Sequence, residues 1–279
     1  MGNATFIVWR ETIEAMLVIG ILHGWLSAQQ SLEAASRRRA FHWLWGGVTA
    51  GIGLAVLLAL TLLGIQSWAS DTTLEWFQAL MPLLASALIF QMVVWMRRHG
   101  AGLKRGLEAE LETVSARANW LGMAALATLA VGREGAEAVI FLYGAGTTEA
   151  PTQTLIGGAL GFALALACYG LLAQGGRWFS WRVFFRITEI LLLLLGGALL
   201  VDAMDKLIGL EALPALMDPL WNAGFLLDDS GRAGGFVAAF TGWRAHPAGS
   251  SYLALALWWG LAWLLVLRAR PAAKRAGRP

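Results

Sequence analysis

The sequence predicts an all-α integral membrane protein with seven transmembrane helices, and three observations support this fold class. The 279 residues are 58% hydrophobic and only 14% charged, whereas a soluble domain has about 45–50% apolar and about 25% charged residues. The mean hydropathy is +0.61. The apolar residues also gather into stretches of roughly 20, the length that crosses about 30 Å of hydrocarbon, without the ten-residue alternation typical of barrel strands.

Seven apolar stretches follow one another along the chain. They are residues 4–26, 41–65, 74–96, 118–143, 154–172, 184–204 and 252–267. The last stretch is short, but it ends in tryptophan and arginine side chains, which anchor helices at a membrane interface. We expect residues 1–270 to form one transmembrane domain, with an outer loop at 205–251 and a seventh helix at 252–268. Residues 271–279 then form a basic cytoplasmic tail.

The basic residues orient these helices. Sixteen of the 21 Lys and Arg residues lie in or directly beside the connections after the first, third and fifth stretches and in the tail. Because cytoplasmic loops carry an excess of Lys and Arg, we expect the N-terminus outside and the C-terminus in the cytoplasm. The net charge of only +3 and the apolar composition exclude a nucleic-acid-binding module. The single cysteine, Cys168, excludes an intrachain disulfide framework and a cysteine-based metal site.

The first and fourth predicted helices carry the same charged pattern, R-E-x-x-E-A. Its charged members are Arg10, Glu11 and Glu14 in the first helix and Arg133, Glu134 and Glu137 in the fourth. Because residues three and four positions apart share a helix face, each helix presents two carboxylates and one guanidinium on one stripe. Charged residues inside a membrane are costly, and by default they mark a functional path.

The positions of the two copies predict an inverted repeat. Each copy lies roughly 10–18 Å below the outer surface at a rise of 1.5 Å per residue, and the two helices run in opposite directions. Residues from about 3 to 97 and from about 118 to 206 then form a 3+3 inverted repeat, and the seventh helix lies outside it. In transporters built this way the binding site lies at the repeat interface near the midplane.

The four glutamates, Glu11, Glu14, Glu134 and Glu137, are the predicted metal ligands. Beside two arginines they leave a charge of about −2 in a low dielectric, which is unfavourable unless a cation or protons neutralise it. Oxygen ligands at this density suit a hard cation rather than copper(I) or zinc. A buried salt bridge that locks two helices is the alternative, but a lock needs no second, uncompensated glutamate in each copy.

Other polar residues have weaker signals. The outer loops are acidic, and an acidic vestibule concentrates cations, so Glu75, Asp228 and Asp229 are candidate ion-collecting residues. Glu189 could pair with Arg186 near the cytoplasmic end of the sixth helix. The small-xxx-small glycine pairs predict close helix packing; they are Gly20/Gly24, Gly47/Gly51 and Gly157/Gly161.

The paired R-E-x-x-E patterns within a seven-span chain resemble the oxidase-dependent iron permeases. That family includes the fungal high-affinity iron permease and the bacterial EfeU-type ferrous-uptake permease. The resemblance extends to the outer segments Asp228-Asp229-Ser230-Gly231 and Gly242-Trp243-Arg244-Ala245-His246-Pro247. The first copy departs from the usual R-E-G-x-E, since Thr12 stands in place of glycine, and this β-branched residue changes how closely a neighbouring helix approaches.

The resemblance implies a permease, not an enzyme, that imports iron across a plasma membrane or bacterial inner membrane. It implies that Glu11, Glu14, Glu134 and Glu137 bind iron, with Arg10 and Arg133 orienting them. Iron is then the transported substrate and no cofactor is expected. A separate extracytoplasmic oxidase, cupredoxin or iron-binding protein would supply Fe(III).

Three alternatives stay open at this point. The first is a transporter of another hard metal ion such as Mn(II) or Fe(II), because the ligands would be nearly the same. The second is a membrane carboxylate redox subunit, although the chain lacks the Glu-x-x-His pairs of a di-iron site. The third is a structural subunit of an uptake complex in which another chain forms the ion pathway.

Overall fold

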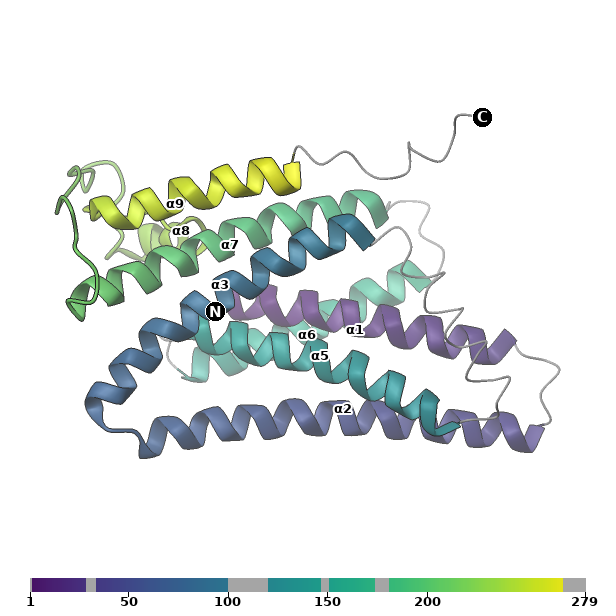
Figure 1. Ribbon diagram of the computed structural model, residues 1–279. Coiled ribbons are helices and arrows are strands. Elements are labelled where there is room, and N and C mark those ends of the chain that lie inside the picture. Colours follow the sequence, from purple (N-terminus) through teal and green to yellow (C-terminus); the bar gives the residue numbers. More distant parts are fainter. Residues whose placement is uncertain (1, 29–33, 100–119, 147–150, 174–180, 268–279) are drawn as a thin grey trace.

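The computed structural model describes residues 2–28, 34–99, 120–146, 151–173 and 181–267, and these residues form helices and connecting segments without a β-strand (Figure 1). Every described part of the predicted apolar stretches lies in a helix. The long helices are α1 (Gly2–Ala28), α2 (Ala34–Trp68), α3 (Asp71–His99), α5 (Trp120–Gly146), α6 (Pro151–Ala173) and α7 (Trp181–Gly209). A 14-residue helix, α9 (Gly249–Ala262), continues into one π-helical turn at Trp263–Leu267.

The chain is a multi-pass integral membrane protein. Among the described residues, four helical segments have the length and apolar composition needed to cross a membrane: Ala34–Trp68, Asp71–Arg97, Thr152–Gly170 and Arg186–Gly209. A shorter apolar helix covers Gly249–Leu265. The helices α1 and α5 are each 27 residues long, but each contains an arginine and two glutamates, which lower the hydropathy of the whole segment.

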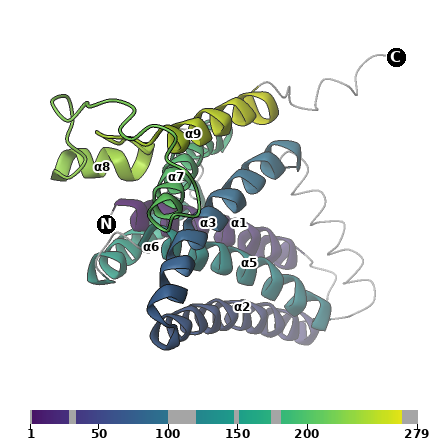
Figure 2. The same ribbon diagram turned by 60° about the vertical axis from the view of Figure 1, so that its left-hand side comes forward.

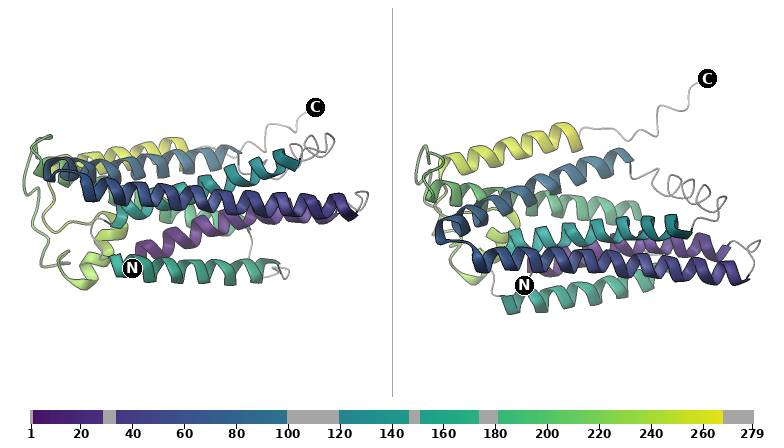
Figure 3. Two further views of the ribbon diagram at one scale, coloured as in Figure 1. Left: turned by 90° about the horizontal axis from the view of Figure 1, so that it is seen from below. Right: turned by 60° about the horizontal axis from the view of Figure 1, so that its bottom comes forward.

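Helices that lie far apart in the sequence pack together. α2 lies along α5, α6 lies along α1, α3 packs against α7, and α1 contacts α5 (Figure 3). Glycines allow the first two pairs to approach closely. A Cβ at Gly51 would lie 2.9 Å from the backbone nitrogen of Gly132 in α5, and one at Gly161 would lie 2.9 Å from the backbone nitrogen of Trp9 in α1.

Both members of the Gly47/Gly51 pair and Gly161 of the Gly157/Gly161 pair therefore serve helix packing. In the third pair, only Gly20 has a close neighbour: a Cβ there would meet the Tyr169 hydroxyl group. The prediction is wrong for Gly24, because a Cβ there would have no neighbour within 4 Å.

The apolar core lies where α1, α3, α5, α7 and α9 meet. Its fully buried side chains include Ile7, Ile89, Phe141, Leu192 and Leu195, and the buried Trp258 of α9 packs against them. The most apolar 18-residue segments of α2 and α6 are only 17% buried, compared with 56% in α7. The peripheral helices α2 and α6 thus present leucine, isoleucine and valine side chains to the lipid.

The segment between α7 and α9 covers the end of the bundle at which α1 begins (Figure 2). It contains a ten-residue helix, α8 (Arg232–Thr241), which the sequence analysis did not predict. The Asn3 side-chain amide donates a hydrogen bond to the Ala239 carbonyl (3.3 Å), which ties α1 to α8. Arg244 donates to Asp205 at 2.8 Å and attaches the segment to α7, and Ser251 donates to the same carboxylate at 2.6 Å and joins α9 to α7.

Candidate functional site

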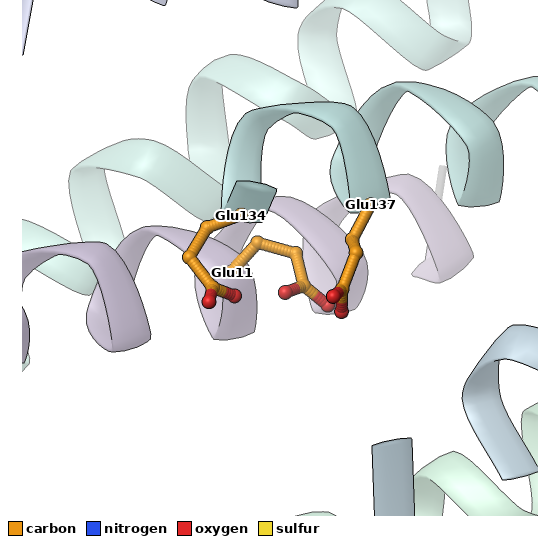
Figure 4. A group of neighbouring side chains, drawn as sticks. All are labelled: Glu11, Glu134 and Glu137. Atoms are coloured by element: carbon orange, nitrogen blue, oxygen red, sulfur yellow. The ribbon is translucent and has the colours of Figure 1, made fainter. Parts of the chain in front are cut away.

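The helices α1 and α5 bring three of the four predicted glutamates together. One carboxylate oxygen each of Glu11, Glu134 and Glu137 lies within 4.8 Å of the others. Figure 4 shows the three side chains converging, one from α1 and two from α5. Glu11 is 2% exposed and Glu134 is 8% exposed. Close contact between antiparallel helices is what places residues from the two copies of the motif side by side.

Each of these three carboxylates has an oxygen without a partner. Oε2 of Glu11, Oε2 of Glu134 and Oε2 of Glu137 are buried and accept no hydrogen bond from the described residues. A buried polar atom without a partner typically costs about 1–3 kcal/mol, and more when it is charged. Three neighbouring carboxylates that each keep such an oxygen form a set of ligands suited to a cation.

Glu14, the fourth predicted ligand, is held by Arg10 and is not part of that group of three. Arg10 is 1% exposed, and its Nη1 donates to Glu11 Oε1 at 2.6 Å. Its Nη2 donates to Glu14 Oε1 one helical turn away. The guanidinium therefore links the two carboxylates of α1, as expected for a residue that orients them.

Arg133 plays the corresponding part on α5 in a more open position. Its Nε donates to Glu137 Oε1 at 2.8 Å, but its side chain is 46% exposed. The guanidinium carbon lies 4.9 Å from the centre of the Trp95 ring of α3, a cation–π contact. The two copies of the motif are thus alike in sequence and different in burial.

Helix α3 forms a third wall of the site, which the sequence analysis missed. The Arg10 guanidinium donates to the sulfur of Met92 at 3.1 Å and to the sulfur of Met96 at 3.2 Å. With Trp95, these residues occupy the part of α3 that faces both arginines. Their spacing of four residues is the only signal in the sequence, and methionines at such spacing usually belong to an apolar core.

A cavity of about 470 Å³ lies at the end of the bundle where α1 begins. Its lining includes Asn3, Gly144, Gln153, Asp202, Asp229 and Arg244. Asn3 Oδ1 is buried there and accepts no hydrogen bond from the described residues. Gly144 is seven residues beyond Glu137 on α5, so a rise of 1.5 Å per residue places the cavity roughly 10 Å from the carboxylates.

The structure places the three candidate ion-collecting residues differently. Asp229 lines this cavity, whereas neither Glu75 nor Asp228 is among its described lining residues. Asp228 is exposed and accepts hydrogen bonds from the hydroxyl and backbone amide of Ser230, which lower the pKa of its carboxyl. Glu75 is exposed in the second turn of α3.

The prediction that Glu189 pairs with Arg186 is wrong. Glu189 accepts a hydrogen bond from Arg97 Nε at 2.6 Å, and this ion pair joins α7 to α3. Arg186 lies on an exposed position of α7. The pairing follows from the packing of α3 against α7, which brings a basic residue of one helix to the acidic residue of the other.

Comparison with known proteins gives consistent matches over most of the chain. The sequence profile of the Iron permease FTR1 family covers residues 1–271. "Ferrous iron permease EfeU" of Escherichia coli O6:H1 (strain CFT073) is 28% identical over 207 residues, which are 71% of this chain and 70% of that protein. The protein of the same name from Yersinia pestis is 27% identical over 207 residues, 71% of this chain and 69% of that protein. No solved structure matches the chain.

Proposed function

The chain belongs to the Iron permease FTR1 family, whose members transport iron across membranes, and we propose that Glu11, Glu134 and Glu137 bind the iron in transit. Two observations carry this proposal: the three carboxylates approach one another within 4.8 Å, and each keeps one buried oxygen without a hydrogen-bond partner among the described residues. Arg10 holds Glu14 beside this group, so Glu14 is the fourth ligand once its carboxylate turns from Arg10 toward the ion.

The charge of the site supports a cation as its occupant. Four glutamates and two arginines leave an excess of two negative charges if all are ionised. Burying unpaired charges costs several kcal/mol each, so either protons or a metal ion must compensate them. Carboxylate oxygens are hard ligands, which suits an iron ion and explains why neither a cysteine nor a histidine is needed.

The helix packing supports two inverted halves that move relative to each other. α2 of the first half lies on α5 of the second, and α6 of the second half lies on α1 of the first, as a pseudo-two-fold axis requires. α1 and α5, which carry the ligands, contact each other at the centre. This arrangement matches alternating access around a fixed site, in a bacterial inner membrane with seven spans and the N-terminus outside.

The route to the site begins at the cavity beside α8. Asp229 and Asp202 line it. Asp202 is paired with Lys206 and Arg244, so Asp229 is the acidic side chain that we assign to attracting cations there. Glu75 and Asp228 extend the acidic surface outside the cavity. Iron then passes about 10 Å down the interface between α1 and α5 to reach the glutamates.

The oxidation state of the ion separates two candidates. Fe(III), handed over by a separate oxidase, cupredoxin or iron-binding protein, is what the sequence resemblance implies, and four carboxylates suit it. Fe(II), or another dication such as Mn(II), is the alternative, and the name of the relatives, ferrous iron permease, favours Fe(II). Uptake assays that offer ferric citrate, ascorbate-reduced iron and competing Mn(II) decide between them.

Reconstituted protein tests the site directly. The variants Glu134→Gln and Glu137→Gln keep the size of the side chain and remove its charge, and we expect them to abolish uptake of radiolabelled iron into liposomes. Glu211→Gln, at an exposed position beyond α7, is the matched control and keeps wild-type uptake. Full uptake by both site variants contradicts the proposal. Uptake by the wild-type chain alone also excludes a purely structural subunit.

A further inference from the structure

Two methionine sulfurs lie beside the glutamates, and the carboxylate site does not use them. The side chain of Met92 is only 3% exposed, and its sulfur lies 3.1 Å from Arg10 Nη1. The sulfur of Met96 lies 3.2 Å from Arg10 Nη2. Both sulfurs, and not merely the methyl groups, are directed at the guanidinium.

The guanidinium of Arg10 is therefore surrounded by two oxygens and two sulfurs. Nη1 donates to Glu11 Oε1 and to Met92, and Nη2 donates to Glu14 Oε1 and to Met96. Arginine remains charged in proteins, so these four acceptors converge on a positive charge. Two carboxylates and two thioethers around one cationic group are also a ligand set for a metal cation.

Packing alone does not account for this arrangement. Leucine fills the volume of methionine at small cost, whereas a thioether contributes only a weak hydrogen bond to a guanidinium. What the sulfur adds is affinity for a soft or borderline metal ion. Thioethers bind Cu(I) and similar ions well and do not suit a hard ion such as Fe(III).

Glu11 joins the two sets of ligands. Its Oε1 bonds to Arg10 beside the sulfurs, while its Oε2 is unpartnered and its carboxylate belongs to the group with Glu134 and Glu137. An ion bound by Glu11 can thus shift from one set to the other without losing all of its ligands. The glutamates that the ion leaves behind are then available to compensate a displaced guanidinium.

We propose that Met92 and Met96, together with Glu11 and Glu14, form a second coordination site that takes iron as Fe(II) when the Arg10 guanidinium moves aside. This inference rests on the proposed function in its ferrous form. While iron is absent, the guanidinium of Arg10 occupies this second site. Fe(III) is excluded from it, because the thioethers are soft ligands.

X-ray absorption of the purified full-length protein loaded anaerobically with Fe(II) tests the proposal. We expect iron–sulfur scattering in the Cys168→Ala protein, a background that removes the only thiol. Met92→Leu combined with Met96→Leu should remove this scattering while iron stays bound through oxygen. Met123→Leu, a change at a buried methionine in the core between α1, α2 and α5, should leave it unchanged.

The possible outcomes separate this inference from the proposed function. Iron bound through oxygen or nitrogen alone in the Cys168→Ala protein overturns the thioether site and leaves the carboxylate site standing. Sulfur scattering that survives the double methionine change also overturns it. Iron binding that does not depend on Glu134 and Glu137 overturns the proposed function itself, and the inference falls with it. An absence of iron–sulfur scattering in the Cys168→Ala protein overturns the inference even if the double variant does not fold.

Discussion

Replacing Gly161 by alanine tests whether the approach of α6 to α1 positions the carboxylates. The added Cβ would meet the Thr5 carbonyl oxygen, would lie 2.9 Å from the Trp9 backbone nitrogen and would lie 3.1 Å from Val8 Cβ. Two of these neighbours are backbone atoms, which cannot rotate away. The helices must therefore separate, and α1 carries Glu11 and Glu14.

The expected change in the free energy of unfolding for Gly161→Ala follows from two opposing effects. Overpacking a tight contact costs about 1–3 kcal/mol, and alanine returns about 1 kcal/mol over glycine within a helix. Because the contacts at Gly161 are with backbone, we expect the upper part of that range and a net loss of about 1–2 kcal/mol. Gly170 lies on the same helix with nothing within 4 Å of a Cβ, so Gly170→Ala should stabilise the protein by about 0.5–1 kcal/mol.

The packing of α2 against α5 offers the same comparison. A Cβ at Gly51 of α2 would lie 2.9 Å from the Gly132 backbone nitrogen of α5, whereas one at Gly53 would have no neighbour within 4 Å. We expect Gly51→Ala to destabilise the protein and Gly53→Ala to leave it unchanged or more stable. Both tight positions control a helix that carries carboxylates, so both variants should also bind iron more weakly.

Thermal unfolding in detergent, followed by iron titration, measures both effects. At about 2–4 °C per kcal/mol for a chain of 150–250 residues, each tight variant should melt several degrees below its matched control. Equal melting temperatures for Gly161→Ala and Gly170→Ala would refute the packing argument. A large stability loss with unchanged iron affinity would refute only the link between helix spacing and the site.

Two further predictions concern the arginines and an ion pair. Arg10→Lys should raise the KM for iron uptake at least tenfold, and Arg133→Lys should raise it less. The reason is that Arg10 is 1% exposed and bonds two carboxylates, whereas Arg133 is 46% exposed and bonds one. Equal effects of the two changes in uptake kinetics would contradict this difference. Glu189→Gln should lower stability by about 1–2 kcal/mol, because it removes the charged partner of a half-buried arginine, and the double change Arg97→Gln/Glu189→Gln should recover part of the loss in thermal unfolding. A double variant that is no more stable than the single variant would show that the pair is not coupled.

The helices could be predicted from the sequence because a membrane-spanning segment appears as a stretch of about 20 apolar residues. The repeated R-E-x-x-E pattern also indicated which helices carry charge, and Glu11, Glu134 and Glu137 do lie together. What the pattern could not give is how Arg10 divides its bonds. Nη1 binds Glu11 and Nη2 binds Glu14 at i+4, yet only Glu11 also belongs to the group with Glu134 and Glu137.

The remaining features depend on contacts between distant helices. Met92 and Met96 have no charge or motif to distinguish them from core residues, and only the crossing of α3 over α1 brings them to Arg10. The predicted partner of Glu189 was wrong for the same reason, because Arg186 is near it in sequence whereas Arg97 is near it in space. Helix α8 contains two consecutive glycines, which lower helix propensity, so its ten residues gave no clear helical signal.

The packing of α1 and α2 against helices from later in the chain has a consequence for biogenesis. Because α2 rests on α5 and α1 rests on α6, the first three helices cannot bury their mating surfaces until the later ones leave the ribosome. A fragment that stops after α3 should therefore remain incompletely packed in the bilayer and be digested readily by proteases. Separately expressed fragments ending and beginning within residues 100–119 should rescue each other, each supplying the surface on which the other completes its assembly.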